Sequence, residues 1–169
     1  MWKEKDLFFM QKALMQANVA FKKNEVPVGV VIVDDAGKIV SRAYNKIEGI
    51  GCQAGHAEVL AIKKACKKIG GWRLDGCSIY VTLEPCLMCL GLIQLSRIKN
   101  LYFGAVSEEF GSGLSDVKKH KFYKKDLKIA GGLKEKECAD ILKLFFKNIR
   151  KKKRVYYETK TRVFGKSKT

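Results

Sequence analysis

Two short motifs in this sequence combine residue types that bind metal ions and move protons. One is His-Ala-Glu at positions 56–58, and the other is Pro-Cys-Leu-Met-Cys at positions 85–89. Cys86 and Cys89 are three positions apart, so a helix would place both sulfurs on one face. In the first turn of that helix, the dipole and the free backbone N–H groups favour the thiolate, which is the form that binds metals.

Zinc is the metal that suits this set of side chains. The imidazole of His56 and the thiolates of Cys86 and Cys89 supply three protein ligands, and a tetrahedral ion then keeps one position for water. A structural zinc site would call for a fourth protein ligand, so three ligands favour catalysis. Glu58 could take a proton from that water and return it to a leaving group. We therefore predict one Zn²⁺ per chain, held by His56, Cys86 and Cys89, with Glu58 as the catalytic acid–base group.

Alternating helices and strands are predicted around these motifs. Apolar spacing and turn residues predict, in chain order, a helix over 3–23, strands over 28–33 and 38–44 joined as a hairpin, a helix over 57–69, a strand over 78–83, a helix over 86–96 with Pro85 at its start, a strand over 100–106, a weaker strand over 127–130 and a final helix over 135–150. This order predicts a three-layer α/β/α fold, in which helices flank a mixed central sheet of about five strands.

The 169 residues are the length of one domain. We predict a catalytic domain over 1–150 and a basic C-terminal tail over 151–169, with a long polar loop over 107–125. The six cysteines are expected to be metal-binding or buried thiols in a reducing cytoplasm, because the start of the chain is not typical of a secretory signal. No run of 18 apolar residues occurs, so no membrane-spanning helix is expected.

The net charge of +17 indicates a polyanionic partner, and nucleic acid is the leading candidate. Basic residues crowd the end of the chain, where Glu158 is the single acidic residue after Asp140. The candidate nucleic-acid contacts are Lys151, Lys152, Lys153, Arg154 and the ring of Phe146. A lysine-rich composition, or a solvated C-terminus, would explain the same charge without a partner.

The two motifs resemble the signature of the zinc-dependent cytidine deaminase superfamily. Within it, the chain is most similar to the tRNA adenosine deaminase family, which makes inosine at the wobble position. The similarity runs from Glu25 to about Lys153. It includes the segments 25–29, 44–45, 56–58, 72–74, 80–89, 96–98 and 103–105.

The resemblance implies a cytidine deaminase-like fold, a homodimer, and the anticodon stem-loop of tRNA as partner. Glu58 would carry protons from water to N1 of the purine and to the departing ammonia, while attack falls on C6. Asn45 would hydrogen-bond the flipped base, and Val28 and Leu83 would line its pocket.

Two segments depart from the family pattern. The chain has Cys-Gln-Ala-Gly at 52–55, where the family usually has Asp-Pro-Thr-Ala, and Val-Ser at 106–107, where an Arg-Asp-like pair often occurs. Two alternatives stay open. One is a deaminase of a free base, nucleoside or nucleotide of the guanine or cytosine type. The other is a catalytically silent RNA-binding subunit whose zinc is structural.

Overall fold

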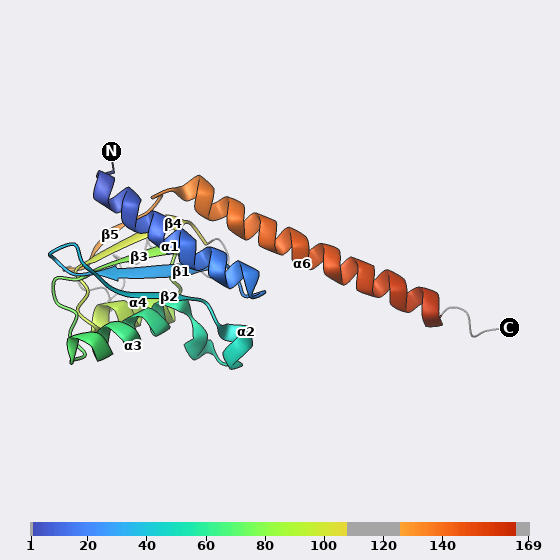
Figure 1. Ribbon diagram of the computed structural model, residues 1–169, viewed down its shortest axis with the longest axis horizontal. Coiled ribbons are helices and arrows are strands. Elements are labelled where there is room, and N and C mark those ends of the chain that lie inside the picture. Colours follow the sequence, from blue (N-terminus) through green and yellow to red (C-terminus); the bar gives the residue numbers. More distant parts are fainter. Residues whose placement is uncertain (1, 108–125, 165–169) are drawn as a thin grey trace.

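Five strands form one mixed sheet in the computed structural model, which describes residues 2–107 and 126–164 but not the side chains of Lys153 and 155–164 (Figure 1). The strands lie in the order β2-β1-β3-β4-β5. Their bounds are β1 Gly29–Val33, β2 Ile39–Tyr44, β3 Ser78–Leu83, β4 Asn100–Ala105 and β5 Lys128–Ala130. The weakly predicted fifth strand is thus confirmed.

Strand β1 runs against the other four strands. It pairs antiparallel with both β2 and β3, whereas β4 pairs parallel with β3 and β5 pairs parallel with β4. Strands β2 and β3 therefore point the same way and end at the same edge of the sheet. After β2 and after β3, the chain leaves that edge and enters a helix.

Helices cover both faces of the sheet, which confirms the predicted three-layer α/β/α fold (Figure 1). Helices α3 (Ala57–Ile69) and α4 (Leu87–Leu95) lie on one face, and α1 (Glu4–Lys22) and α6 (Glu135–Phe164) lie on the other. Strand β1 shows why both layers are needed. Val30 and Ile32 pack in the cluster that includes α3 and α4, while Val31 and Val33 pack in the cluster that includes α1. A strand buried on both faces is a continuous apolar run.

Hydrogen bonds and close packing fix α1 against the sheet. The Tyr80 hydroxyl in β3 donates to the buried carboxylate of Asp6 at 2.7 Å. Gly29, at the start of β1, lies against the backbone of α1, and a Cβ there would collide with the carbonyl oxygen of Ala13. These contacts fix α1 across β1 and β3.

Three differences from the predicted elements stand out. Short helices α2 (Ile47–Ile50) and η1 (Gln53–Gly55) occupy a stretch predicted as loop, because a single turn is too short to produce a periodic pattern. The fourth helix begins at Leu87 rather than Cys86, so Pro85 precedes its N-cap and lies outside its first turn.

The last helix was predicted to end at Arg150 and continues to Phe164. Its apolar stripe stops where the chain leaves the sheet, but the lysines and arginines that follow are good helix formers. The predicted loop over 107–125 lies, apart from Ser107, outside the described residues. Among the helices that are described, none has the length and apolar character needed to cross a bilayer.

Candidate active site

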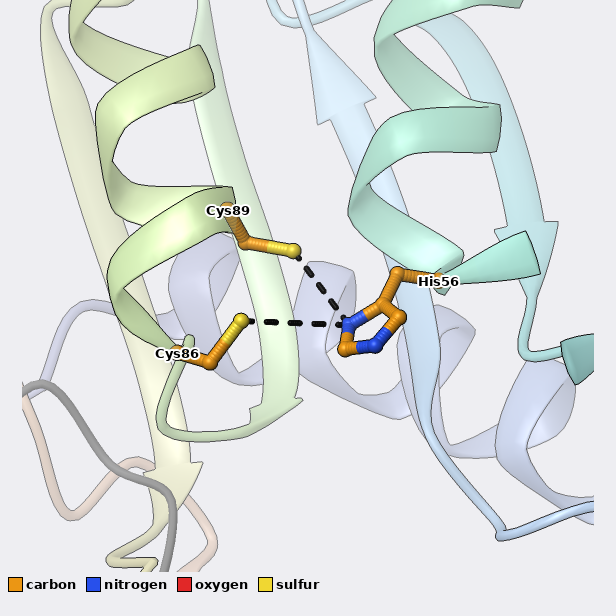
Figure 2. A group of neighbouring side chains, drawn as sticks. All are labelled: His56, Cys86 and Cys89. Atoms are coloured by element: carbon orange, nitrogen blue, oxygen red, sulfur yellow. Dashed lines mark hydrogen bonds between the residues drawn. The ribbon is translucent and has the colours of Figure 1, made fainter. Parts of the chain in front are cut away.

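The edge where β2 and β3 end holds the residues of both motifs (Figure 2). His56 is the N-cap of α3, and Cys86 is the N-cap of α4. Both have extended backbones, with φ −54° and ψ 138° at His56 and φ −70° and ψ 168° at Cys86. Cys89 follows in the first turn of α4. Figure 2 shows the two cysteine side chains pointing from α4 toward the imidazole at the start of α3.

The three side chains are spaced as ligands of one ion. The Nδ1 atom of His56 lies 3.4 Å from Sγ of Cys89 and 3.9 Å from Sγ of Cys86. In a tetrahedral zinc site, with Zn–S near 2.3 Å and Zn–N near 2.0 Å, a nitrogen and a sulfur lie about 3.5 Å apart. The ligand atoms all lie within 4.8 Å of one another, and the group includes no fourth His, Cys, Asp or Glu from the described residues. The group therefore fits a zinc ion with three protein ligands.

The two sulfurs differ in their affinity for a proton. The hydrogen bond from Cys89, together with the backbone N–H groups of Cys89 and Met88 and the charge of His56, outweighs burial and lowers the pKa of Cys86 to about 5. Donation to Cys86 and burial raise the pKa of Cys89 far above its usual range. Cys86 therefore loses its proton at lower pH than Cys89. This is the ionisation expected at a helix N-terminus.

Glu58 lies next to this group, in the first turn of α3. It is only 4% exposed, and burial raises its pKa above the usual range, although its backbone hydrogen bond and the charge of His56 act in the opposite direction. The side chains of Glu58 and Cys89 interact directly. His56 and Glu58 are two positions apart, which within a helix would separate them. The extended backbone at His56 lets both reach the same region.

The predicted base-binding residues lie at the same edge of the sheet. Asn45 is buried directly after β2, and its backbone N–H donates to the carbonyl of Val28 at 3.0 Å. Because Val30 pairs with Val81, continuing the β1–β3 register places Val28 opposite Leu83. The structure therefore brings these three residues close to one another. Their binding to a substrate stays a prediction.

Two polar residues of this region were missed from the sequence. The buried carboxylate of Glu25 accepts hydrogen bonds from the backbone N–H groups of Glu48 at 3.1 Å and Gly49 at 2.7 Å, and from Nδ2 of Asn45 at 3.4 Å. Gln53 contacts Nε2 of His56 through its Oε1 atom at 2.9 Å. Contacts between a loop and a distant residue leave no periodic pattern in the sequence, so the role of Glu25 could not be predicted. For Gln53, its position three residues before His56 was the one feature that could have indicated a contact with the imidazole.

The predicted nucleic-acid contacts lie along α6. Phe146 is 44% exposed, and Lys151, Lys152 and Arg154 are exposed, whereas the side chain of Lys153 is outside the described part of the chain. The ammonium group of Lys152 donates to Oδ1 of Asn24 at 3.2 Å. A groove of about 630 Å³ runs between α6 and the end of α1, and it is lined by Lys23, Asn24, Glu25, Val26, Glu48, Gly49, Phe145, Phe146 and Ile149. The groove thus reaches Glu25, which holds Asn45.

The sheet order and the His-Cys-Cys group beside a buried glutamate define a protein with the cytidine deaminase-like fold. The MafB19-like deaminase family matches residues 4–150. The tRNA-specific adenosine deaminase of Bacillus subtilis is 41% identical over 151 residues, which cover 88% of this chain and 93% of that protein. The chain belongs to the tRNA-specific adenosine deaminase family.

Solved structures agree with this assignment. One, from a study of A-to-I editing by tRNA:A34 deaminases at the wobble position of transfer RNA, is 38% identical with a TM-score of 0.75, and the match covers 80% of this chain and 99% of that chain. A guanine deaminase of Bacillus subtilis is 34% identical with a TM-score of 0.57, and the match covers 67% of this chain and 74% of that chain.

Zinc is expected to protect Cys86 from alkylation. In metal-free protein at pH 7 the Cys86 thiolate should react readily with iodoacetamide, because its pKa is about 5. Added Zn²⁺ should slow this reaction by roughly tenfold or more, since the sulfur becomes a ligand. Mass spectrometry of peptides measures the rate at each cysteine. Exposed Cys52, which is outside the metal-binding group, is the internal control and should react at the same rate throughout. An unchanged rate at Cys86 would contradict zinc binding by this group.

Proposed function

We propose that this protein deaminates adenosine to inosine in tRNA, at the wobble position of the anticodon, with one Zn²⁺ per chain. The single observation that carries the proposal is the convergence of His56, Cys86 and Cys89 beside buried Glu58, in a chain of this family. In this proposal residues 1–150 form the zinc deaminase domain, 151–169 form a basic segment, and the enzyme works in the cytoplasm.

The reaction replaces the 6-amino group of adenosine with an oxygen from water. His56, Cys86 and Cys89 would hold the zinc ion, which when bound makes water a stronger nucleophile at neutral pH. Glu58 takes a proton from the attacking water and delivers it to N1 of the purine. As the bond between C6 and the amine breaks, Glu58 passes the second proton of the water to the amine, which leaves as ammonia. Inosine keeps the proton on N1, so atoms and charges balance.

Glu58 is suited to both halves of this proton transfer. A general acid–base group works best when its pKa is near the working pH. Burial raises the pKa of Glu58 toward that range, and its contact with Cys89 keeps the carboxyl group beside the ligands. A subunit with a structural zinc would not need this buried carboxyl group, so its presence favours an enzyme over the silent RNA-binding subunit.

The base would be held by the residues at the ends of β1, β2 and β3. Asn45 donates one N–H of its carboxamide to Glu25, which leaves its oxygen for an N–H of the base. Val28 and Leu83 supply apolar contacts to the faces of the ring. The reacting base must leave its stack, so a single-stranded anticodon loop is a suitable substrate.

A deaminase of free guanine or a related base is the competing function. The similarity to a guanine deaminase favours it, but that match covers a smaller part of the chain at a lower TM-score than the tRNA:A34 deaminase match. A free base would also not need the net charge of +17. Turnover of guanine, adenosine and tRNA by the same preparation separates the two functions.

Glu58→Gln is expected to lower inosine formation in tRNA by about 10²-fold or more, because the variant has no proton carrier. Mass spectrometry of nucleosides from treated tRNA measures inosine, and metal analysis checks that zinc is retained. Glu137→Gln, an exposed change in the first turn of α6, is the matched control and should leave activity unchanged. Wild-type protein that carries zinc and forms no inosine, or that turns over guanine far faster than tRNA, would overturn the proposed function.

We further propose that α6 and its groove contact the phosphates and bases of the RNA through Phe146, Lys151, Lys152, Lys153 and Arg154. Substituting glutamine for Lys151 and Lys152 should raise KM for tRNA several-fold. It should also weaken the salt dependence of binding. The slope of log K against log salt concentration should become less steep by about one unit for each phosphate that the variant no longer neutralises. Activity at saturating tRNA should change little. The control, Lys63→Gln with Lys67→Gln on α3, removes the same charge elsewhere. Equal effects of the two pairs would show that only net charge matters.

A homodimer formed through α4 is also proposed. The outer face of α4 carries three exposed apolar side chains, with exposed fractions of 67% for Leu87, 47% for Met88 and 65% for Leu95. A cluster of exposed apolar side chains is typical of a surface that binds another protein. Leu95→Glu should convert the dimer to a monomer in light scattering at micromolar concentration. Leu144→Glu, at a site 52% exposed on α6, should leave the dimer intact. A monomeric wild-type protein would contradict the proposal.

A further inference from the structure

We propose that Gln53 is a positioning residue for metal binding. When the ion binds, Gln53 holds the imidazole of His56 with its proton on Nε2, so that Nδ1 offers its lone pair to the ion. The inference rests on the proposed function, because it takes His56 as a zinc ligand.

The two ring nitrogens of His56 face different partners. Nδ1 lies toward the sulfurs of Cys86 and Cys89, and Nε2 lies 2.9 Å from Oε1 of Gln53. A neutral imidazole carries one proton, and the hydrogen bond at one nitrogen decides which tautomer is present. In the Nε2–H tautomer, Nε2 donates to the side-chain Oε1 atom of Gln53. The other tautomer would set the Nε2 lone pair against that oxygen and place a proton where the metal must bind.

The turn that carries Gln53 is itself fixed. Its backbone carbonyl accepts the N–H of His56 at 3.2 Å, and the carbonyl of Gly55 accepts the N–H of Lys46 at 2.9 Å. Gly55 packs so closely that an added Cβ would lie 2.8 Å from the backbone of Lys46. At the start of the turn, Sγ of Cys52 accepts the N–H of Ala54 at 3.4 Å. The Gln53 side chain is therefore presented to the ring by an ordered support.

A hydrogen-bond acceptor on the far nitrogen of a histidine ligand orients the ring and makes the ligand more basic. Removing such a partner typically lowers metal affinity by about 10- to 100-fold. The hydrogen bond between Gln53 and His56 is solvent-exposed, so its removal should fall at the lower end of that range. We expect a decrease of about tenfold in zinc affinity.

Two variants of Gln53 separate this role from a structural one. Gln53→Met keeps the size of the side chain and removes the acceptor, whereas Gln53→Glu keeps an acceptor oxygen. Competition with a chromophoric zinc chelator measures the affinity of each protein. Gln53→Met should bind zinc about tenfold more weakly, and Gln53→Glu should bind at least as tightly as wild type. Gln11→Met, at an exposed position of α1, is the matched control.

The tautomer gives a second measurement that does not depend on activity. Proton–nitrogen NMR of the zinc-loaded protein should show an Nε2–H proton of His56 that exchanges slowly with water in wild type and faster in Gln53→Met.

Equal zinc affinity of Gln53→Met and wild type, or an equal decrease in Gln53→Glu, would overturn this inference alone. A wild-type protein that does not bind zinc would overturn the proposed function as well. Inactivity on tRNA, with the expected order of zinc affinities, would overturn the proposed substrate and support the role of Gln53.

Discussion

The shared direction of β2 and β3 determines where the reactive groups of this protein lie. Because antiparallel β1 separates them, these two strands end at one edge of the sheet, and the helices that follow them begin there. His56 and Cys86 are N-caps of those helices, so the fold brings them together although they are far apart in the sequence. Reversing either strand would move one motif to the opposite edge. The chemistry therefore depends first on strand direction and only then on the ligands.

Burial and helix termini together set the charges at this edge. The free N–H groups at the start of α4 lower the pKa of Cys86 and so favour its thiolate. Glu58 is buried away from water, which raises the pKa of its carboxyl group. Donation to Cys86 and burial both raise the pKa of Cys89. A divalent ion would take the place of the Cys89 proton and neutralise the excess negative charge. The proposed metal binding and the proposed proton-carrying role of Glu58 would in this way both result from one electrostatic arrangement.

The helices and strands that leave a regular pattern of apolar residues could be predicted from the sequence. A continuous apolar run marked β1, and the alternating apolar residues Ile79, Val81 and Leu83 marked β3. The spacing of Cys86 and Cys89 indicated a helix start. Features fixed by contacts between distant residues could not be predicted. The carboxylate of Glu25 holds a loop more than twenty residues away, which no local pattern reveals. Helix α6 extends past Arg150 through polar residues, because intrinsic helix propensity continues after the apolar stripe ends.

In the proposed enzyme, His56, Cys86 and Cys89 bind one zinc ion and leave its fourth position to water. X-ray absorption at the zinc edge of the loaded wild-type protein is the decisive experiment, because the method counts ligand atoms by type and distance. We expect two sulfurs at about 2.3 Å and two nitrogen or oxygen atoms at about 2.0 Å, one of them from water that added small anions displace. A shell with three or four sulfurs, or with none, would contradict this ligand set.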